Sequence, residues 1–430
     1  MESSNFADIE EKVLERVSNS RGLWSDLEAL CALGGRFAGT ESEAQARLLL
    51  SRRLQEACGV DVVAHPIDYA GWSRGEEASL EILASSQPRL PCVPLVRSPA
   101  PPPEGLTAEV LDMGRGGERD FARLAEKLPG RIALVRHEYM FASDTVHRRR
   151  KYQWALQGGA VGFLIGSPWP GNLPVTGSCG AEPGSGIPAA GLSAETVERI
   201  TGSGPQPRVK LRMELTEAPA RTANLLAELP GRGQGWVVLC AHLDGHHLSQ
   251  SAMDNGTGVA AALCVAEALA PHMDRMERGL RVMFFSVEEW ALTGSRIYVD
   301  GLDAAQRSAI GLVINLDAVA GSSQLTALTS DFAKAEQFLV QSAHAMGSEL
   351  GVHRPLMANS DHFNFARRGI PAARIVAGFN EPTSNLKYVL TPGDTLDKVS
   401  PGDLRSAARL IAGLTLRACA APELALRESD

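Results

Sequence analysis

The chain has 430 residues, of which 44% are hydrophobic and 21% are charged, so it has ample material for the core of a soluble globular protein with more than one domain. Its formal net charge of −8 argues against a nucleic-acid partner, because phosphate binding requires a basic surface. No apolar run approaches the roughly 20 residues of a membrane span, and the acidic first residues lack the apolar core of a secretion signal.

The seven cysteines are scattered along the chain and form no CxxC pair. An odd number of isolated cysteines is typical of reduced thiols rather than of a disulfide framework. Together with the acidic first residues, this pattern predicts a cytoplasmic protein.

The first sixty residues have a helical pattern. Apolar residues three and four apart predict helices over residues 8–17 and 23–33, and Thr40 with its acidic neighbours opens a longer helix that ends near Gly59. Arg36 lies in the loop between these helices. We expect its side chain at the surface, and the wall of a cleft is the alternative.

Residues 60–69 alternate as a strand, and a change to short strands and prolines then marks a second unit. Residues 130–135, 148–156 and 158–165 predict strand, helix and strand, which is the order of a parallel pair. Residues 209–215 alternate as a strand that leads out of this unit.

Two stretches of the second unit have alternative interpretations. Residues 167–188 are rich in glycine and proline and form either a lid or an ordinary surface loop. The four cations from Arg148 to Lys151 are expected mainly on a solvated helix face, and contact with an acidic substrate is the alternative.

Three apolar runs each end in side chains that can bind a metal. Parallel strands place their carboxyl ends at one edge of a sheet, where ligands bind. One imidazole and several carboxylates suit zinc or a similar divalent ion. The runs and their polar residues are WVVLC before His242 and Asp244, RVMFF before Glu288 and Glu289, and LVINL before Asp317, with Asp254 at the head of a helix between the first two.

Each of these residues also has a simpler interpretation. Glu288 alone could be a solvent-exposed acid in a loop, and Asp254 could cap the N-terminus of a helix. His242 could be a core histidine whose ring nitrogens are hydrogen-bonded within the protein. Their combination favours the metal site.

The sequence resembles the zinc aminopeptidase family, metallopeptidase family 28, in the form that carries an inserted protease-associated domain. The resemblance covers about residues 21–420. The matching segments are HLD at 242–244, DNGTG at 254–258, the Glu288–Glu289 pair, Asp317, SDH at 360–362 followed by GIPAAR, TPGDTLDKVS at 391–400, and LPGRIALVR, GGAVGFLIG and GIPAAGLS in the insert.

The resemblance implies an α/β fold of the zinc exopeptidase type, with a mixed, mostly parallel sheet and helices on both faces. Residues 1–73 and 217–430 would form the catalytic domain. Residues 74–216 would form the inserted, β-rich protease-associated domain.

The resemblance also implies a role for each polar residue. His242 and Asp317 would bind one zinc ion, Glu289 would bind a second, and Asp254 would bridge the two. Glu288 would be the general base. Asp244 would orient His242 from behind. From the residues themselves, we expect His362 to support the cleft, with metal binding as the alternative. Arg374, which follows an apolar strand entry, is expected either to bind the substrate or to form a structural salt bridge.

One position departs from the family pattern. The family has a histidine ligand before the Thr-x-x-Asp-Thr segment, where this chain has Leu390. Leucine cannot bind a metal, so we expect one tight zinc ion and a weak or absent second one, unless His246, His247 or His362 is recruited.

These observations predict a metal-dependent hydrolase that cleaves a terminal amide bond of a short peptide or an aminoacyl conjugate. An acyl-transfer or cyclising enzyme similar to glutaminyl cyclases, and a metal-depleted interaction protein, are the alternatives. The expected binding partner is the peptide or aminoacyl substrate, and a second copy of the chain is a further candidate. Binding to nucleic acid or membranes is not expected.

Overall fold

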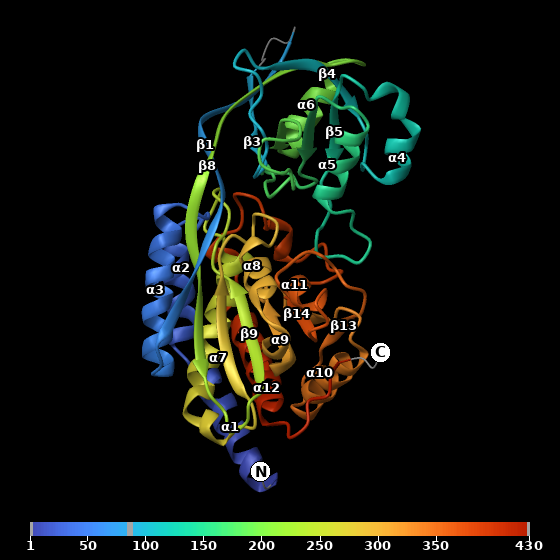
Figure 1. The fold of residues 1–430 in the computed structure, drawn as a ribbon. Coiled ribbons are helices and arrows are strands. Elements are labelled where there is room, and N and C mark those ends of the chain that lie inside the picture. Colours follow the sequence, from blue (N-terminus) through green and yellow to red (C-terminus); the bar gives the residue numbers. More distant parts are fainter. Residues whose placement is uncertain (1–2, 84–88, 428–430) are drawn as a thin grey trace.

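The structure is a computed structural model that describes residues 3–83 and 89–427. A larger α/β part carries both described chain ends, and a smaller part lies above it, connected by a long two-stranded ribbon (Figure 1). The two parts together create the site described below.

The larger part is built on a mixed sheet whose central strands are parallel. β9 pairs in parallel with β10 and β11, and β11 pairs in parallel with β14, whereas β12, β8 and β1 join antiparallel to their inner neighbours. This confirms the predicted mixed, mostly parallel sheet. In spatial order the strands are β13 (Gly351–His353), β12 (Leu325–Leu328), β14 (Ala372–Ala377), β11 (Ile310–Leu316), β9 (Trp236–His242), β10 (Gly279–Phe285), β8 (Arg208–Leu229) and β1 (Val62–Ile82).

Helices cover both faces of this sheet, as predicted (Figure 1). The residues of β9 from Val237 to Ala241 are fully buried, as expected for a parallel strand with helices on both sides. One face carries α7 (Thr257–Leu269) and α12 (Pro401–Ala420), with α1 (Ser3–Ser18), α2 (Gly22–Ala32), α3 (Glu41–Cys58) and α10 (Ala333–Ala345) packed around them; the other carries α8 (Thr293–Gly301), α9 (Ala304–Ala309) and α11 (His362–Ala366).

The three N-terminal helices are confirmed, and their ends have clear causes. The Thr40 side chain accepts a hydrogen bond from the Glu43 amide at 3.4 Å and begins α3. Gly59 adopts a left-handed φ of 66° and ends it. Short helical turns complete the larger part, namely η2 (Ala252–Gly256), η3 (Ala270–Arg275), η4 (Asn385–Tyr388) and η5 (Leu396–Lys398).

The ribbon of β1 and β8 runs through both parts. The strands pair antiparallel from Val62 opposite Ala227 to Ile82 opposite Val209, with a register shift between Arg74 and Ala78. Both strands are much longer than predicted, because their mixed composition in the middle hides the pairing from sequence patterns. The proposed domain boundaries at residues 74 and 216 lie near this register shift.

The smaller part contains a second set of parallel strands. The predicted strand, helix and strand are present as β5, α5 and β6, and β5 and β6 are parallel. β6 begins later than predicted because residues 158–161 turn after the helix. The elements are β2 (Arg89–Pro91), β3 (Val93–Pro94), β4 (Leu106–Asp112), α4 (Glu118–Arg123), η1 (Ala125–Lys127), β5 (Ile132–Arg136), α5 (Arg148–Gln157), β6 (Gly162–Gly166), β7 (Ala189–Leu192) and α6 (Ala194–Gly202).

Two expectations about cations are wrong. Arg36 is fully buried, and its guanidinium donates to the carbonyl oxygens of Leu243, Gln250 and Ser251. Arg148 and Lys151 are buried rather than solvated, because α5 packs them against the rest of the protein. Lys151 pairs with Glu138 inside the insert.

Within the described residues, no helix is long and apolar enough to cross a bilayer. All seven cysteines are present there as free thiols, as predicted. The cytoplasmic location stays a prediction.

Candidate metal centre

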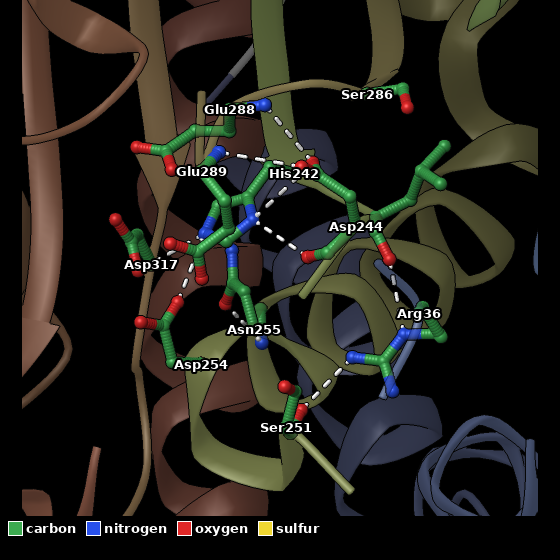
Figure 2. A network of polar contacts seen from close by, with 12 residues as sticks. Arg36, His242, Asp244, Ser251, Asp254, Asn255, Ser286, Glu288, Glu289 and Asp317 are labelled. Carbon is green, nitrogen blue, oxygen red and sulfur yellow. Dashed lines mark hydrogen bonds and ion pairs between the residues drawn. The ribbon is translucent and has the colours of Figure 1, made fainter. Parts of the chain in front are cut away.

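Three neighbouring strands deliver the predicted polar side chains to one place. His242 is the last residue of β9, Glu288 and Glu289 follow β10, and Asp317 follows β11 directly. Because these strands are parallel, their carboxyl ends meet at the same edge of the sheet. Figure 2 shows the side chains converging there.

His242 is at the centre of this group. Its Nε2 lies 3.1 Å from Oδ1 of Asp254 and 3.6 Å from Oδ1 of Asp317 (Figure 2). Its Nδ1 lies 3.0 Å from the carbonyl oxygen of Asp244, which fixes the ring from behind. Only 1% of His242 is exposed. The structure therefore brings His242, Asp254 and Asp317 together as predicted.

Asp244 positions the two glutamates as well as the imidazole. Its carboxylate accepts hydrogen bonds from the amides of Glu288 at 3.1 Å and Glu289 at 3.3 Å, and lies 3.8 Å from Nδ1 of His242. Complete burial raises the pKa of Asp244 to about 7, although the charge of His242 opposes the rise. Asp244 thus ties the end of β9 to the turn after β10.

Two residues without a predicted role hold Asp254. The Asp394 carboxylate accepts from the amides of Met253 at 2.7 Å and Asp254 at 3.2 Å. The Asn255 side chain donates to the Leu316 carbonyl at 2.8 Å and accepts from the Ala318 amide at 3.2 Å. Asn255 therefore connects Asp254 to the loop of Asp317. The TPGDT segment contained the signal for Asp394, but nothing in it indicated which amides the acid would bind.

Arg374 forms an ion pair with a proposed zinc ligand. Its Nη2 lies 3.2 Å from Oδ2 of Asp317, and its Nη1 donates to the Asn359 carbonyl at 3.2 Å. Burial alone would raise the pKa of Asp317, but the Arg374 guanidinium and His242 hold it well below its ordinary value. Of the two roles expected for Arg374, the salt bridge is present.

Glu288 and Glu289 are both buried, at 8% exposure each. Burial raises the pKa of both carboxyl groups well above the ordinary value, although the charge of His242 opposes the rise. Strongly perturbed carboxyl groups in a cleft are typical of functional sites.

The donor set fits one divalent metal ion. One ligand atom from each of His242, Glu288 and Asp317 lies within 4.8 Å of the others, and this is the one such group that the described residues form. Oδ1 of Asp317 and Oε1 of Glu289 are buried without a hydrogen-bond partner, as expected of oxygen atoms that bind a cation. Imidazole and carboxylate donors suit zinc.

The other histidines lie outside this metal-binding group. His246 is buried and accepts a hydrogen bond from the Leu248 amide, and His247 packs edge-on against Phe37 at 5.3 Å. His362 is fully buried at the start of α11, and burial lowers its pKa to about 3. Leu390 borders the cavity at 2% exposure.

A small cavity of about 40 Å³ lies in front of the centre. Its lining includes the acids Asp254, Glu288, Glu289 and Asp317 from the larger part and Arg148, Arg149 and Ser178 from the insert. The segment 167–188 reaches this cavity through Ser178, and the Thr176 amide donates to the Leu390 carbonyl at 2.9 Å. Its function as a movable lid stays a prediction.

Two family models match the chain, Peptidase family M28 over residues 224–415 and the PA domain over residues 93–200. Residues 224–415 belong to peptidase family M28. The chain is a metallopeptidase hydrolase with an inserted PA domain, so the resemblance found in the sequence is confirmed. The M28 match contains every residue of the metal-binding group.

Relatives and solved structures agree with this assignment. The M28 chain is 26% identical to Aminopeptidase YwaD of Bacillus subtilis over 392 residues, 88% of this chain and 80% of the relative. It is 27% identical to Carboxypeptidase Q of Homo sapiens over 397 residues, which are 87% of this chain and 80% of the relative.

Solved structures share the fold along the whole chain. The Peptidase M28 precursor from Shewanella amazonensis has a TM-score of 0.82 at 23% identity, with 99% of this chain and 100% of that chain covered. The aminopeptidase from Aneurinibacillus sp. strain AM-1 has a TM-score of 0.72 at 21% identity, with 98% of each chain covered. At these identities the likeness shows the fold alone.

Proposed function

We propose that this M28 chain is a zinc-dependent, aminopeptidase-like hydrolase that cleaves a terminal amide bond of a short peptide or an aminoacyl conjugate. The observation that carries the proposal is the contact of His242 with Asp254 and Asp317 beside a buried Glu288. The aminopeptidase and carboxypeptidase names of the relatives support an exopeptidase role.

His242, Asp254 and Asp317 would hold the zinc ion. Zinc bound there supplies a Lewis acid that polarises a substrate carbonyl and makes water acidic enough to deprotonate near neutral pH. Because Nδ1 of His242 contacts the Asp244 carbonyl at 3.0 Å, Nε2 is the nitrogen that would bind the metal.

Glu288 would act as the general base. Its amide is fixed by Asp244, and its carboxyl group belongs to the same close group as His242 and Asp317. Burial raises its proton affinity, so it can take a proton from the attacking water and pass it to the leaving amine. Glu289 borders the same cavity and would be a ligand of a second, weaker ion.

The centre would bind one ion tightly. Leu390 stands at the cavity wall where the family has a histidine, and no other histidine of the described residues joins the metal-binding group. A second ion would have only Asp254 and Glu289 as protein ligands, which is too few for a tight site.

The test is a hydrolysis screen with a panel of short peptides and aminoacyl amides. We expect turnover with the purified chain, its loss after chelation and its recovery with about one equivalent of zinc. Release of an amino acid supports hydrolysis at a chain end, whereas release of ammonia with ring closure would contradict it in favour of a cyclising enzyme. Activity that persists after complete zinc removal would refute the proposal.

A further inference from the structure

Three residues of the turn after β10 have strained backbone conformations. This turn carries Glu288 and Glu289 and leads from β10 into α8. Val287, Ala291 and Leu292 adopt left-handed φ angles of 61°, 65° and 61°. The left-handed region is unfavourable for residues with a Cβ atom, and a β-branched residue there is a rare outlier. Such conformations persist only where the surrounding structure holds them in place.

Asn224, in β8, joins the two ends of this turn. Its side-chain oxygen accepts a hydrogen bond from the Ser286 amide at 3.0 Å, and its side-chain nitrogen donates to the Gly294 carbonyl at 3.1 Å. Only 1% of Asn224 is exposed. Loss of its side chain would therefore remove the acceptor of a buried amide, which is unfavourable.

Gly294 allows the two ends of the turn to approach each other. A Cβ atom at this position would lie 2.0 Å from the Ser286 carbonyl oxygen and 2.7 Å from the side-chain oxygen of Asn224. A larger residue would push the two ends apart. The turn over residues 286–294 is therefore a closed loop, and the Asn224 amide group holds it shut.

A second buried asparagine fixes the end of the turn that leads into α8. Nδ2 of Asn364, in α11, donates to the Leu292 carbonyl at 3.0 Å and to Oγ of Ser295 at 2.8 Å. Leu292 is one of the three residues in the left-handed conformation. Asn364 is 3% exposed, so this contact is buried as well. Two different elements, β8 and α11, thus hold the turn.

Two carboxylates complete the attachment of the turn. Asp244 accepts from the amides of Glu288 and Glu289 (Figure 2). Glu43, in α3, accepts from the Ser286 hydroxyl at 3.0 Å. None of these contacts occupies the carboxyl group of Glu288, which borders the cavity at the metal centre. The surrounding side chains fix the backbone of the turn and leave this carboxyl group available for chemistry.

We propose that Asn224 and Asn364 are positioning residues, which hold the turn of residues 286–294 so that the carboxyl group of Glu288 faces the metal centre. This inference rests on the proposed role of Glu288 as general base and adds the residues that aim it. The side chains of both asparagines contact the turn and the start of α8. A strained turn relaxes when one attachment is removed, which would displace Glu288 and leave the proposed zinc ligands in place.

The experiment measures kcat, KM and zinc affinity for Asn224→Ala, Asn364→Ala and the unmodified full chain, with a peptide that the unmodified chain cleaves. We expect kcat to fall at least about tenfold in each variant, because a small displacement of a catalytic group lowers the rate. KM and zinc affinity should change less than about threefold. An unchanged kcat in both variants, or a parallel loss of zinc affinity, would overturn the proposal.

Leu54→Ala is the control for a general loss of stability. Leu54 is fully buried in α3, so its truncation leaves a cavity in the core and lowers the melting temperature. Its kcat, measured well below that melting temperature, should equal the kcat of the unmodified chain. If L54A lowers kcat as much as N224A, the asparagines act through stability alone and the proposal is wrong.

Hydrogen exchange tests the turn without any substrate. The amides of residues 286–294 should exchange at least about tenfold faster in N224A and N364A than in the unmodified zinc-loaded chain, and at an unchanged rate in L54A. If the unmodified chain cleaves no peptide, the proposed function fails, whereas faster exchange confined to this segment still supports the role of the asparagines. Equal exchange of this segment in all four chains would refute it.

Discussion

Arg36 fixes the loop that joins two parts of the metal centre. Its guanidinium donates to the carbonyl of Leu243 at 3.0 Å, of Gln250 at 2.8 Å and of Ser251 at 2.9 Å. Leu243 follows the proposed ligand His242, and Ser251 precedes the turn that carries Asp254. One buried side chain therefore sets the distance between the two ends of this loop.

Replacing Arg36 should destabilise the protein strongly. Arg36→Met leaves three carbonyl groups without their charged donor, which should lower the free energy of unfolding by about 3 kcal/mol or more. Urea unfolding measures this. Arg52→Met is the control, because Arg52 is 67% exposed and its loss should change stability by at most about 0.5 kcal/mol. Equal stability of R36M and R52M would contradict the role of Arg36.

The role of Glu288 can be separated from metal binding. Glu288→Gln keeps the size of the side chain but removes its basicity, so kcat should fall by roughly 10² to 10⁴-fold. Zinc content and melting temperature should stay unchanged. Glu126→Gln, at an exposed position of the insert, is the control and should leave kcat unchanged. Loss of zinc from E288Q would instead identify Glu288 as a metal ligand.

At the scale of elements, the centre depends on how loops attach to strand ends. The turn η2 carries Asp254. The carboxylate of Asp394, far along the chain, accepts hydrogen bonds from the amides of Met253 and Asp254 and so fixes this turn. Burial raises the pKa of Asp394 to about 7. The turn before α7 and the loop before η5 therefore form one unit.

Disrupting this unit should weaken the metal site without removing a ligand. Asp394→Asn replaces one acceptor oxygen by a donor, so either the Met253 amide or the Asp254 amide loses its partner, and zinc affinity should fall by about 10 to 100-fold. Competition with a zinc chelator measures the affinity. Asp397→Asn in the same segment is the control, because that side chain is 67% exposed. An unchanged affinity in D394N would show that η2 keeps its shape without Asp394.

The convergence of the polar side chains at the strand ends could be predicted from the sequence, whereas the hydrogen bonds that hold their loops could not. His242, Glu288 and Asp317 each follow a short apolar run, and the parallel arrangement of such strands brings their ends together. Arg36 and Asp394 bind main-chain groups more than a hundred residues away, and no local pattern identifies those partners.

At the scale of the whole molecule, the insert completes the site. Its loops contact the larger part through Tyr139, whose hydroxyl donates to the Gly378 carbonyl at 2.6 Å, and through the Thr176 amide, which donates to the Leu390 carbonyl at 2.9 Å. These contacts place the start of α5 over the metal centre. The sequence predicted a solvated helix face for Arg148 to Lys151, because the contact of α5 with the larger part depends on the tertiary structure and leaves no local pattern.

The insert should make the protein sensitive to acid. Burial lowers the pKa of His137 to about 3, with further contributions from Arg148 and Lys151, while Glu138 opposes the shift. The folded pKa lies below the ordinary 6.5, so the unfolded chain takes up the proton first as the pH falls. The contribution of neutral His137 to the free energy of unfolding is fully present above about pH 6.5. It decreases as the pH falls towards 3, by at most about 1.4 kcal/mol per pH unit.

Melting temperatures between pH 7.5 and pH 5 measure this effect. The decrease should be smaller in His137→Asn than in the unmodified chain, because the variant has no imidazole to protonate. His344→Asn, at an exposed position of α10, should retain the full decrease. Identical pH profiles of H137N and the unmodified chain would rule out His137 as a source of acid sensitivity.

In the proposed site, His242, Asp254 and Asp317 bind one zinc ion beside Glu288. Anomalous diffraction at the zinc edge from crystals of the zinc-loaded chain tests it most directly. We predict one strong peak in contact with these three side chains. No peak there, or two peaks of equal height with the second at Glu289 and Asp254, would contradict the account.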